Sequence, residues 1–314
     1  MKLSEIVDYL NVLDSLHVPD KCSEALSQLA AVLHTVQHQR PELNPHHVAL
    51  DVQFQSLEAG VVNFGSTVEQ IRQHLQKRIL ELEPEMLRES TRLFEHEMPF
   101  ETNDYILNRR LRLDHQALIK LQGRINILTD WRLPGMMLRP GLESFIEEMV
   151  PMDPLYLVDT HQDLLAPSIQ KFTMEYQRRL RPYVINDRQA GSIMHQLPDN
   201  QFGFVFAFNF FNFRPLELIQ RYLTELHAKL RPGGALIMTY NNCDRSQGVG
   251  LAERCWMLYT PRRLILEHAN QLGFELVDDY NGQGDVSWLE FKRSGDIDSL
   301  RGGQTLAKII ANPQ

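Results

Sequence analysis

The stretch that decides the fold lies in the middle of the chain, where residues 155–161 read LYLVDTH. Apolar and aromatic side chains run without interruption into Asp159, and the apolar spacing then becomes helical, with Leu165 and Ile169. A short buried run that leads into a helix is typical of an inner strand of a parallel sheet. Because open α/β sheets bind ligands at the carboxyl ends of their strands, we expect Asp159 to face a ligand site.

The same alternation of short apolar runs and helical patterns continues from residue 136 to residue 293. Strands separated by helices usually pair in parallel, because a crossover helix returns the chain to the same edge of the sheet. The sequence therefore predicts an α/β domain. We expect its strands at residues 136–138, 155–158, 182–185, 202–208 and 235–240, with a closing pair at 274–277 and 287–291.

The N-terminal part of the chain is predicted to be mainly helical. Apolar residues recur at intervals of three and four in residues 3–16 and 23–39, which is the spacing of one helix face. Residues 46–66 are ambiguous, because part of their apolar pattern alternates as in a strand. A capping sequence that starts at Ser66 predicts the beginning of a long helix, with a break at Pro84.

Composition and charge argue against several classes of function. The chain has 32 Lys and Arg against 40 Asp and Glu, a net charge of −8, so no positive field is expected to attract nucleic acid. No apolar run approaches the roughly 18 residues that a membrane span needs, and the acidic N-terminus lacks the apolar core of a secretory signal. The 3 cysteines form no C-x-x-C pair, which argues against a zinc site or a disulfide framework. We expect a cytoplasmic protein without a metal centre.

Four segments in order resemble the class I S-adenosylmethionine-dependent methyltransferases. The turn at residues 230–234, LRPGG, is similar to the turn before that family's fifth strand, and residues 197–205 resemble the approach to its fourth. Residues 259–261 and 272–275 resemble the borders of its last helix. The resemblance covers about residues 136–293. It implies a Rossmann-like sheet with helices on both faces.

The start of this resemblance and the turns before it predict how the chain divides into domains. Pro99 and the turn at residues 133–135 limit a basic, partly helical stretch. The residues before it do not indicate whether they form a lid, a platform or an oligomer interface. The predicted parts are a mainly helical domain over residues 1–98, a helical linker over residues 99–135 and a Rossmann-like domain over residues 136–314.

The resemblance implies a cofactor site at the ends of the first four strands. Asp159 matches the acid that binds the two ribose hydroxyls of S-adenosylmethionine, and Asp187 matches the residue that accepts a hydrogen bond from the adenine amino group. A carboxylate suits a vicinal diol because it offers two acceptor oxygens. The implied cofactor contacts are Arg139, Pro140, Gly141, Asp159, Thr160, Asp187, Ala207, Phe208 and Asn209.

The first loop departs from the family pattern. The family carries an acid and two or three glycines there, whereas residues 137–144 read MLRPGLES and keep only Gly141. A backbone that approaches a ligand closely favours glycine, because any Cβ takes up the space. Arg139 also adds a positive charge near the place of the sulfonium, which is unfavourable unless the methionine carboxylate compensates it.

Substrate contacts are expected beyond the fifth strand. In the family this segment touches the substrate, which implies Tyr240, Asn241 and Tyr259 as substrate contacts here. A G-x-G sequence at residues 248–250 follows, but no strand runs directly into it. A phosphate loop is therefore not favoured, and we expect a flexible loop at this place. No catalytic residue is identified.

Two functions stay open. The first is methyl transfer to a small-molecule or protein acceptor. Methylation of nucleic-acid bases is not favoured, because the end of the fourth strand lacks the Asn/Asp-Pro-Pro-Tyr pattern of enzymes that methylate bases. The second is a catalytically inactive methyltransferase-fold protein that serves binding or assembly, with the N-terminal helices as an interface for a partner or another copy. The chain also resembles methyltransferase-like proteins of tailed phages, which implies the host cytoplasm or the virion as its location.

Overall fold

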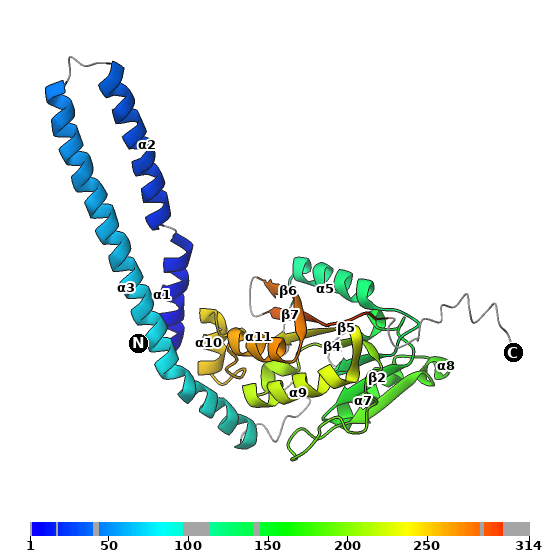
Figure 1. The fold of residues 1–314 in the computed structure, drawn as a ribbon. Helices are drawn as coiled ribbons and strands as arrows, with labels where there is room; N and C mark the ends of the chain where they lie inside the picture. Colours follow the sequence, from blue (N-terminus) through cyan, green and yellow to red (C-terminus); the bar gives the residue numbers. More distant parts are fainter. Residues whose placement is uncertain are drawn as a thin grey trace, which may run out of the picture. The chain divides into compact units, whose positions relative to one another are not determined.

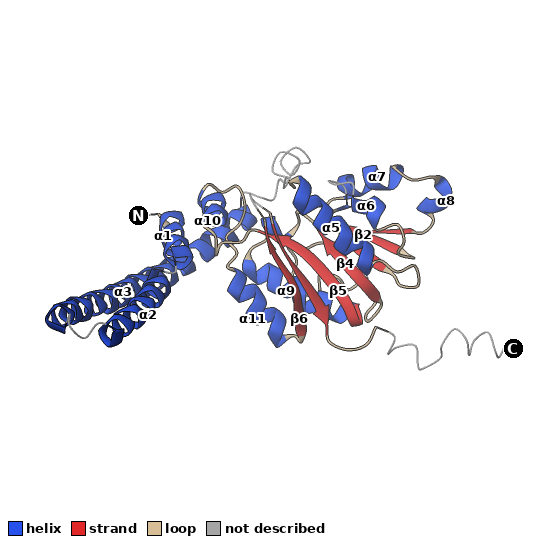
Figure 2. Cartoon of the chain, turned by 90° about the horizontal axis from the view of Figure 1, so that it is seen from above, coloured by secondary structure: helices blue, strands red, loops and turns tan. Residues whose placement is uncertain are grey.

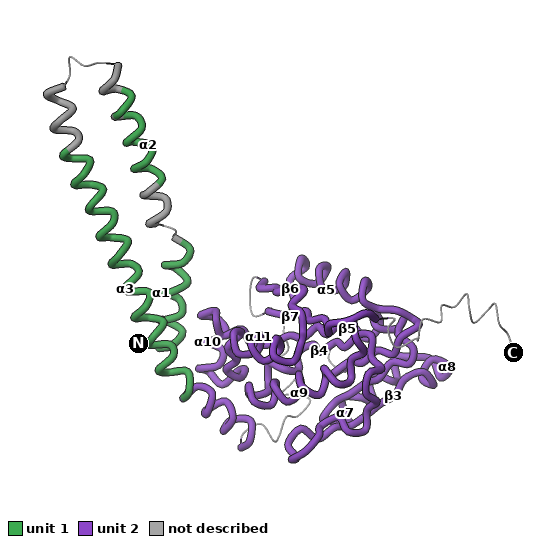
Figure 3. Tube along the Cα trace, in the orientation of Figure 1, with its two compact units in different colours: residues 1–84 green, residues 85–314 purple. Residues whose placement is uncertain are grey.

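The computed structural model describes residues 2–16, 18–39, 44–96, 113–140, 145–282 and 286–297. The chain forms two compact units, one up to Pro84 and one from Glu85 onward (Figure 3). No helix within these described ranges is both long and apolar enough to cross a membrane.

The first unit is helical, as predicted. It contains α1 (Leu3–Leu16), α2 (Val18–Gln39) and most of α3 (Asn44–His96), which are the long helices in Figure 1. Two predictions for α3 are wrong, because the helix neither begins at Ser66 nor breaks at Pro84. The helical apolar spacing extends well before Ser66 and outweighs the local capping signal. At Pro84 the helix continues although it lacks the hydrogen bond of one backbone N–H.

The second unit is built on a seven-stranded sheet with the order β3-β2-β1-β4-β5-β7-β6. Strands β1 to β5 pair in parallel, and β7 is antiparallel to both β5 and β6. All seven predicted strands are present. Their bounds are β1 (Gly135–Leu138), β2 (Leu155–Asp159), β3 (Leu180–Val184), β4 (Phe202–Ala207), β5 (Leu230–Tyr240), β6 (Phe274–Asn281) and β7 (Ser287–Arg293).

Helices cover both faces of the sheet, which confirms the predicted architecture (Figure 2). One face carries α5, α6 and α7, and the other carries α9 and α11. The predicted linker lies partly outside the described residues, and its second half contains α5. The helical segments of this unit are α5 (His115–Leu128), α6 (Phe145–Glu148), α7 (Gln162–Gln170), α8 (Met174–Gln177), the 3₁₀ turn η3 (Phe211–Phe213), α9 (Leu216–Lys229), α10 (Ser246–Glu253) and α11 (Arg262–Gln271).

The centre of the sheet is densely packed. Every residue of β4 is buried, and Phe206 contacts Phe145 of α6 with 5.4 Å between ring centroids. Gly203 is the second residue of β4, and a Cβ there would lie 2.6 Å from Leu133 Cδ1. The glycine therefore lets Leu133 lie directly on the sheet.

Register places the ends of the central strands side by side. Leu138 of β1 pairs with Val158 of β2 and with Ala207 of β4. Asp159 at the end of β2 therefore meets Arg139 and Phe208, which follow β1 and β4, at one edge of the sheet. This is the edge at which open α/β sheets bind ligands.

Candidate functional site

The Asp159 carboxylate is held by its own turn and by an arginine. Its Oδ1 accepts hydrogen bonds from the backbone N–H groups of Thr160 at 2.7 Å and His161 at 3.2 Å. Its Oδ2 lies 3.7 Å from Nε of Arg139, and neither side chain has any exposed surface. The acid predicted to bind ribose therefore already faces a positive charge of the chain itself.

Arg139 enters the site from the end of β1. Its φ of 58° lies in the left-handed region, which residues other than glycine seldom adopt. Its backbone N–H donates to the carbonyl oxygen of Val158 at 2.9 Å, which extends the strand pairing by one residue. The guanidinium carbon then lies 5.1 Å from the ring centroid of Phe210, within the range of a cation–π contact.

A second buried ion pair lies next to the first. The Nε of Arg214 is 3.1 Å from Oδ2 of Asp187, and the Tyr222 hydroxyl donates to the same oxygen at 3.0 Å. Arg214 also donates from Nη2 to Oγ1 of Thr160 at 3.3 Å, and its guanidinium carbon lies 4.0 Å from the Phe210 ring centroid. The Phe210 ring thus contacts both guanidinium groups, and the two ion pairs form one network.

The electrostatics of this network shift the pKa values of Asp159 and Tyr222 in opposite directions. Burial has the largest effect on the Asp159 carboxyl and raises its pKa, but the attraction of Arg139 and Arg214 and the hydrogen bonds of the following turn leave that pKa below its ordinary value of 3.8. Burial and the neighbouring carboxylate raise the pKa of the Tyr222 hydroxyl well above its ordinary value. Tyr222 therefore stays protonated and remains a hydrogen-bond donor to Asp187.

Asn209 has an unusual environment at the end of β4. It is fully buried, has a φ of 52°, and its backbone N–H donates to Oγ1 of Thr239 at 2.7 Å. Within the part of the chain that the structure describes, its amide nitrogen and oxygen have no hydrogen-bond partner, and neither has Oδ2 of Asp159. Buried polar atoms are almost always satisfied, so atoms of this kind indicate water or a ligand.

The other predicted cofactor contacts take varied places. Pro140 is buried and Thr160 is partly buried beside Asp159, whereas Gly141 lies outside the described residues. Ala207 is the last residue of β4, and the Phe208 ring packs on Phe145 with 5.1 Å between centroids. Register and burial therefore bring the described members of the predicted set to one edge of the sheet, but their contact with a cofactor stays a prediction.

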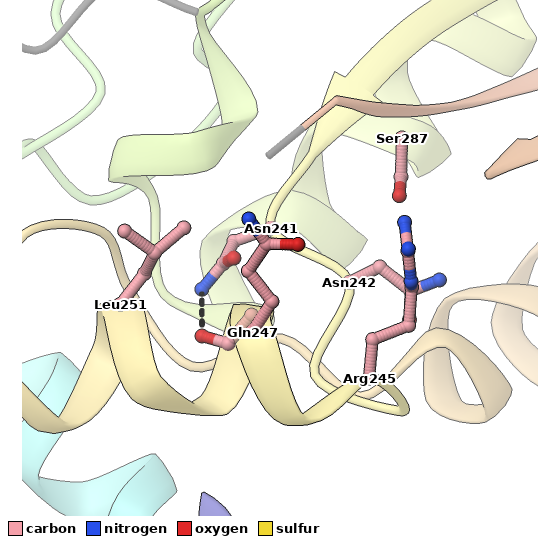
Figure 4. Close-up of a pocket in the computed structure, with 7 residues that line it drawn as sticks. Asn241, Asn242, Arg245, Gln247, Leu251 and Ser287 are labelled. Carbon is pink, nitrogen blue, oxygen red and sulfur yellow. Dashed lines mark hydrogen bonds between the residues drawn. The ribbon is translucent and has the colours of Figure 1, made fainter. Parts of the chain in front are cut away.

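Of the predicted substrate residues, Tyr240 ends β5, Asn241 follows it and Tyr259 lies before α11; all three are buried, and their contact with a substrate stays a prediction. Nδ2 of Asn241 donates to the carbonyl oxygen of Gly248 at 2.9 Å (Figure 4). It also donates to the carbonyl oxygen of Leu258 at 2.9 Å, and so connects α10 with the segment before α11. Tyr240 and Tyr259 are buried, and burial raises the pKa of the Tyr240 hydroxyl. The cavity that Asn241 lines has a volume of about 10 Å³, which is room for about one water molecule.

The G-x-G sequence does not form the loop that was expected. Gly248 and Gly250 lie inside α10, so the prediction of a loop is wrong. A Cβ on Gly248 would collide with the carbonyl oxygen of Asn242, whereas a Cβ on Gly250 would meet no atom within 4 Å. The first glycine is therefore required for close packing of α10 on the end of β5, and the second is not.

Sequence reasoning missed Arg214, Phe210 and Tyr222. Arg214 is the single charged residue that follows the apolar run of residues 202–213, and a buried site can be suspected from a charge in such a place. Its partners could not be found from spacing, because Tyr222 lies on α9 and Asp187 follows β3. Among the described residues, no group of three His, Cys, Asp or Glu could hold a metal ion.

The topology of the sheet identifies the fold. The strand order, with an antiparallel β7 between β5 and β6, agrees with the fold that the sequence resemblance implies. This is the class I methyltransferase fold. No protein-family model matches the chain, and no curated protein matches it.

Solved structures of methyltransferases resemble it distantly. A putative sarcosine dimethylglycine methyltransferase from Galdieria sulphuraria is 11% identical, with a TM-score of 0.45 over 66% of this chain and 98% of that one. A methyltransferase from Mesorhizobium loti is 10% identical, with a TM-score of 0.44 over 55% of this chain and 96% of that one. A geranyl diphosphate C-methyltransferase from Streptomyces coelicolor is 8% identical, with a TM-score of 0.44 over 57% of this chain and 81% of that one. At these identities no residue role is transferred.

The side chains as placed do not fit S-adenosylmethionine. One oxygen of Asp159 is engaged by backbone N–H groups and the other faces Arg139, so neither is available to a ribose diol while the arginine remains. The carboxylate of Asp187 is engaged by Arg214 and Tyr222. A sulfonium ion beside a buried guanidinium would also be repelled by it.

Proposed function

We propose that this chain is a methyltransferase-fold protein that does not transfer methyl groups and that serves binding or assembly. The observation that carries the proposal is the fully buried pair of Arg139 and Asp159 at the edge where the fold binds its ligands. Arg139 pairs with the Asp159 carboxylate, which is the group that a cofactor ribose would need as a hydrogen-bond acceptor.

Admitting a cofactor would require this pair to separate. A buried charge that loses its partner is strongly destabilised, because the surroundings cannot solvate it. The cofactor would have to compensate both Arg139 and Asp159, while the ribose diol offers hydrogen bonds to the acid alone. Arg214 and Asp187 form a second pair that would be disturbed at the adenine end.

A second candidate is the active methyltransferase, and one observation favours it. The amide of Asn209 and Oδ2 of Asp159 have no hydrogen-bond partner among the residues described, and both lie at the ends of central strands. A ligand could supply the missing partners if Arg139 turned to the methionine carboxylate. The acceptor would then be a small molecule or a protein.

Calorimetric titration with S-adenosylmethionine and S-adenosylhomocysteine separates the two candidates. We expect no heat and no thermal shift for the wild-type protein at millimolar ligand. The variant Arg139→Gly frees the acid and suits the positive φ, so it is the variant in which weak binding would first appear. Micromolar binding by the wild type that disappears in Asp159→Ala would overturn the proposal and establish the cofactor site.

Location and origin are separate matters. A cytoplasmic or virion-associated role, with the tailed-phage origin that the sequence suggests, stays a prediction. Co-purification of the chain with intact particles would support the virion role, and recovery only in the soluble host fraction would contradict it.

A further inference from the structure

The helix α5 carries apolar residues on two opposite sides. The side that faces the core is buried and consists of Ala117, Leu121 and Ile125. On the other side Ile119 and Ile127 are exposed, and Trp131 follows just beyond the end of the helix, with exposed fractions of 56%, 70% and 69%. We call Ile119, Ile127 and Trp131 the α5 strip. Exposed apolar side chains that lie in a row mark an interaction site.

Ion pairs on the inner side of α5 keep the strip facing outward. Nζ of Lys120 lies 2.9 Å from Oδ2 of Asp278 in β6, and Nε of Arg124 donates to Oε2 of Glu290 in β7 at 2.7 Å. Because the Glu290 side chain is buried, this pair fixes the rotation of the helix on the sheet. A Cβ on Gly123, in the middle of the outer side, would meet no atom within 4 Å, so another segment can approach there.

The last described residue, Ile297, lies at the same edge of the sheet as the end of the strip. Its backbone nitrogen would be 2.5 Å from a Cβ on Gly233, near the start of β5. Leu133, which comes two residues after Trp131, packs against Gly203 near the start of β4. Since β4 and β5 are neighbouring parallel strands, their starts lie side by side. The chain therefore continues beyond Ile297 from a point close to the exposed indole.

Residues 298–314 follow, and they carry an apolar pattern that suits the strip. They lie outside the described residues and read DSLRGGQTLAKIIANPQ. Leu306, Ile309 and Ile310 recur at intervals of three and four, which is the spacing of one helix face. Two glycines precede this pattern and Pro313 ends it, as expected for a short helix between breakers. A helix of this length is marginal in water and needs a surface to pack against.

We propose that residues 305–312 bind the α5 strip of the same chain as a short helix. Leu306 and Ile310 would cover Ile127 and Trp131, and Lys308 would lie on the opposite side, in solvent. The connection over residues 298–304 spans about 15 Å as a flexible chain and about 24 Å when extended, so the end of the strip is within reach. A helix of eight residues is about 12 Å long, so it leaves Ile119 uncovered.

The tether explains why a segment of the same chain is the occupant. Joining two surfaces by a short linker gives an effective concentration in the millimolar range, well above that of a second copy in solution. A contact of two or three apolar side chains is too small to hold separate molecules together, because association costs translational and rotational freedom. The same contact is sufficient when the linker has already brought the segment close.

Trp131 gives a direct readout of this contact in the full chain. Of the other two tryptophans, Trp288 is fully buried and Trp256 is 40% exposed, so the variant Trp256→Phe leaves one exposed indole. We expect weak quenching of its emission by acrylamide, which is uncharged. Adding Leu306→Asp and Ile310→Asp should raise the quenching constant at least twofold. Adding Ala311→Asp and Asn312→Asp instead introduces the same charge on the opposite helix face and should change nothing.

Variants of the strip test the other side of the contact. Ile127→Asp should raise the quenching of Trp131 as the Leu306 and Ile310 pair does, and the two changes together should add nothing further. Ile119→Asp is the matched control, because it is equally a surface change on α5 but lies beyond the reach of the segment. The urea midpoint of each variant confirms that the sheet unit is folded.

Two results would overturn the proposal. One is a Trp131 that is quenched as strongly in the Trp256→Phe protein as in its Leu306 and Ile310 variant. The other is a protection of Trp131 that grows with protein concentration, which would show that a second copy covers the strip. None of these results depends on whether the crevice at the ends of β1 and β2 binds a cofactor.

Discussion

The two units of this molecule treat charged and apolar groups in opposite ways. In the sheet unit, Arg139 and Asp159 are fully buried and lie beside each other at the ligand edge of the fold. In the helical unit, the ion pair of Arg78 with Glu81 is about half exposed, and so are the apolar side chains of Leu57 and Phe64. The comparison teaches that the fold neutralises its buried charges internally in the sheet unit, whereas the helical unit leaves charged and apolar side chains together at its surface.

The largest effect is expected from breaking the buried pair. Arg139→Met should lower the free energy of unfolding by about 3–5 kcal/mol, because it leaves the Asp159 carboxylate buried without a cation. Urea denaturation followed by fluorescence measures the change. The double variant Arg139→Met with Asp159→Asn should recover most of the loss, since it leaves no buried charge. A single variant as stable as the wild type would show that the pair does not hold the site closed.

The next effect concerns the packing at the end of β5. Gly248→Ala should destabilise the sheet unit by about 1–3 kcal/mol, because its Cβ collides with the carbonyl oxygen of Asn242. Gly250→Ala is the matched control, and it should be neutral or stabilising by up to about 1 kcal/mol, since its Cβ is free. Thermal denaturation of both variants gives the comparison. Equal effects would mean that α10 does not pack as closely as the structure has it.

Acid should weaken the buried pair gradually. The pKa of Asp159 in the folded protein lies below its ordinary value of 3.8, so the stabilisation is complete above that value and is lost as the pH falls through the folded pKa. Each unit of depression corresponds to about 1.4 kcal/mol. Urea denaturation between neutral and strongly acidic pH should show the wild type losing its advantage over Asp159→Asn. A difference that stays constant with pH would contradict this.

The smallest effect is expected in the helical unit. Glu81 pairs with Arg78 at 2.8 Å between Oε2 and Nη1, but both side chains are about half exposed. Exposed pairs of this kind contribute little, because solvent screens them. Glu81→Gln should therefore leave the urea midpoint unchanged within error. A clear loss of stability would remove the contrast between the two units.

The sequence predicts most of the sheet and little of the network inside it. The strands could be recognised because buried runs such as residues 155–158 and 202–208 are bounded by turns and helical spacing. Asp159 could be assigned to the ligand edge because it ends such a run. The ion pair of Asp159 with Arg139 could not, because it depends on the positive φ of Arg139, and residue types do not show dihedral angles.

The long helix was harder to predict for a different reason. Ser66 and Pro84 are strong local signals, and they mislead because the helical spacing of the whole segment outweighs them. Arg214 and Tyr222 join the site from elements far apart in the chain, so only the folded structure shows that both contact Asp187. Local patterns therefore predicted the elements, and the contacts between elements needed the structure.

A crystal structure of the protein grown with millimolar S-adenosylhomocysteine would test the central claim most directly. The account predicts that the Arg139 guanidinium lies against Asp159 with both side chains buried, and that no ligand density lies at the ends of β1 and β2. Density for the ligand with its ribose hydroxyls on Asp159, and with Arg139 turned away from that carboxylate, would contradict it.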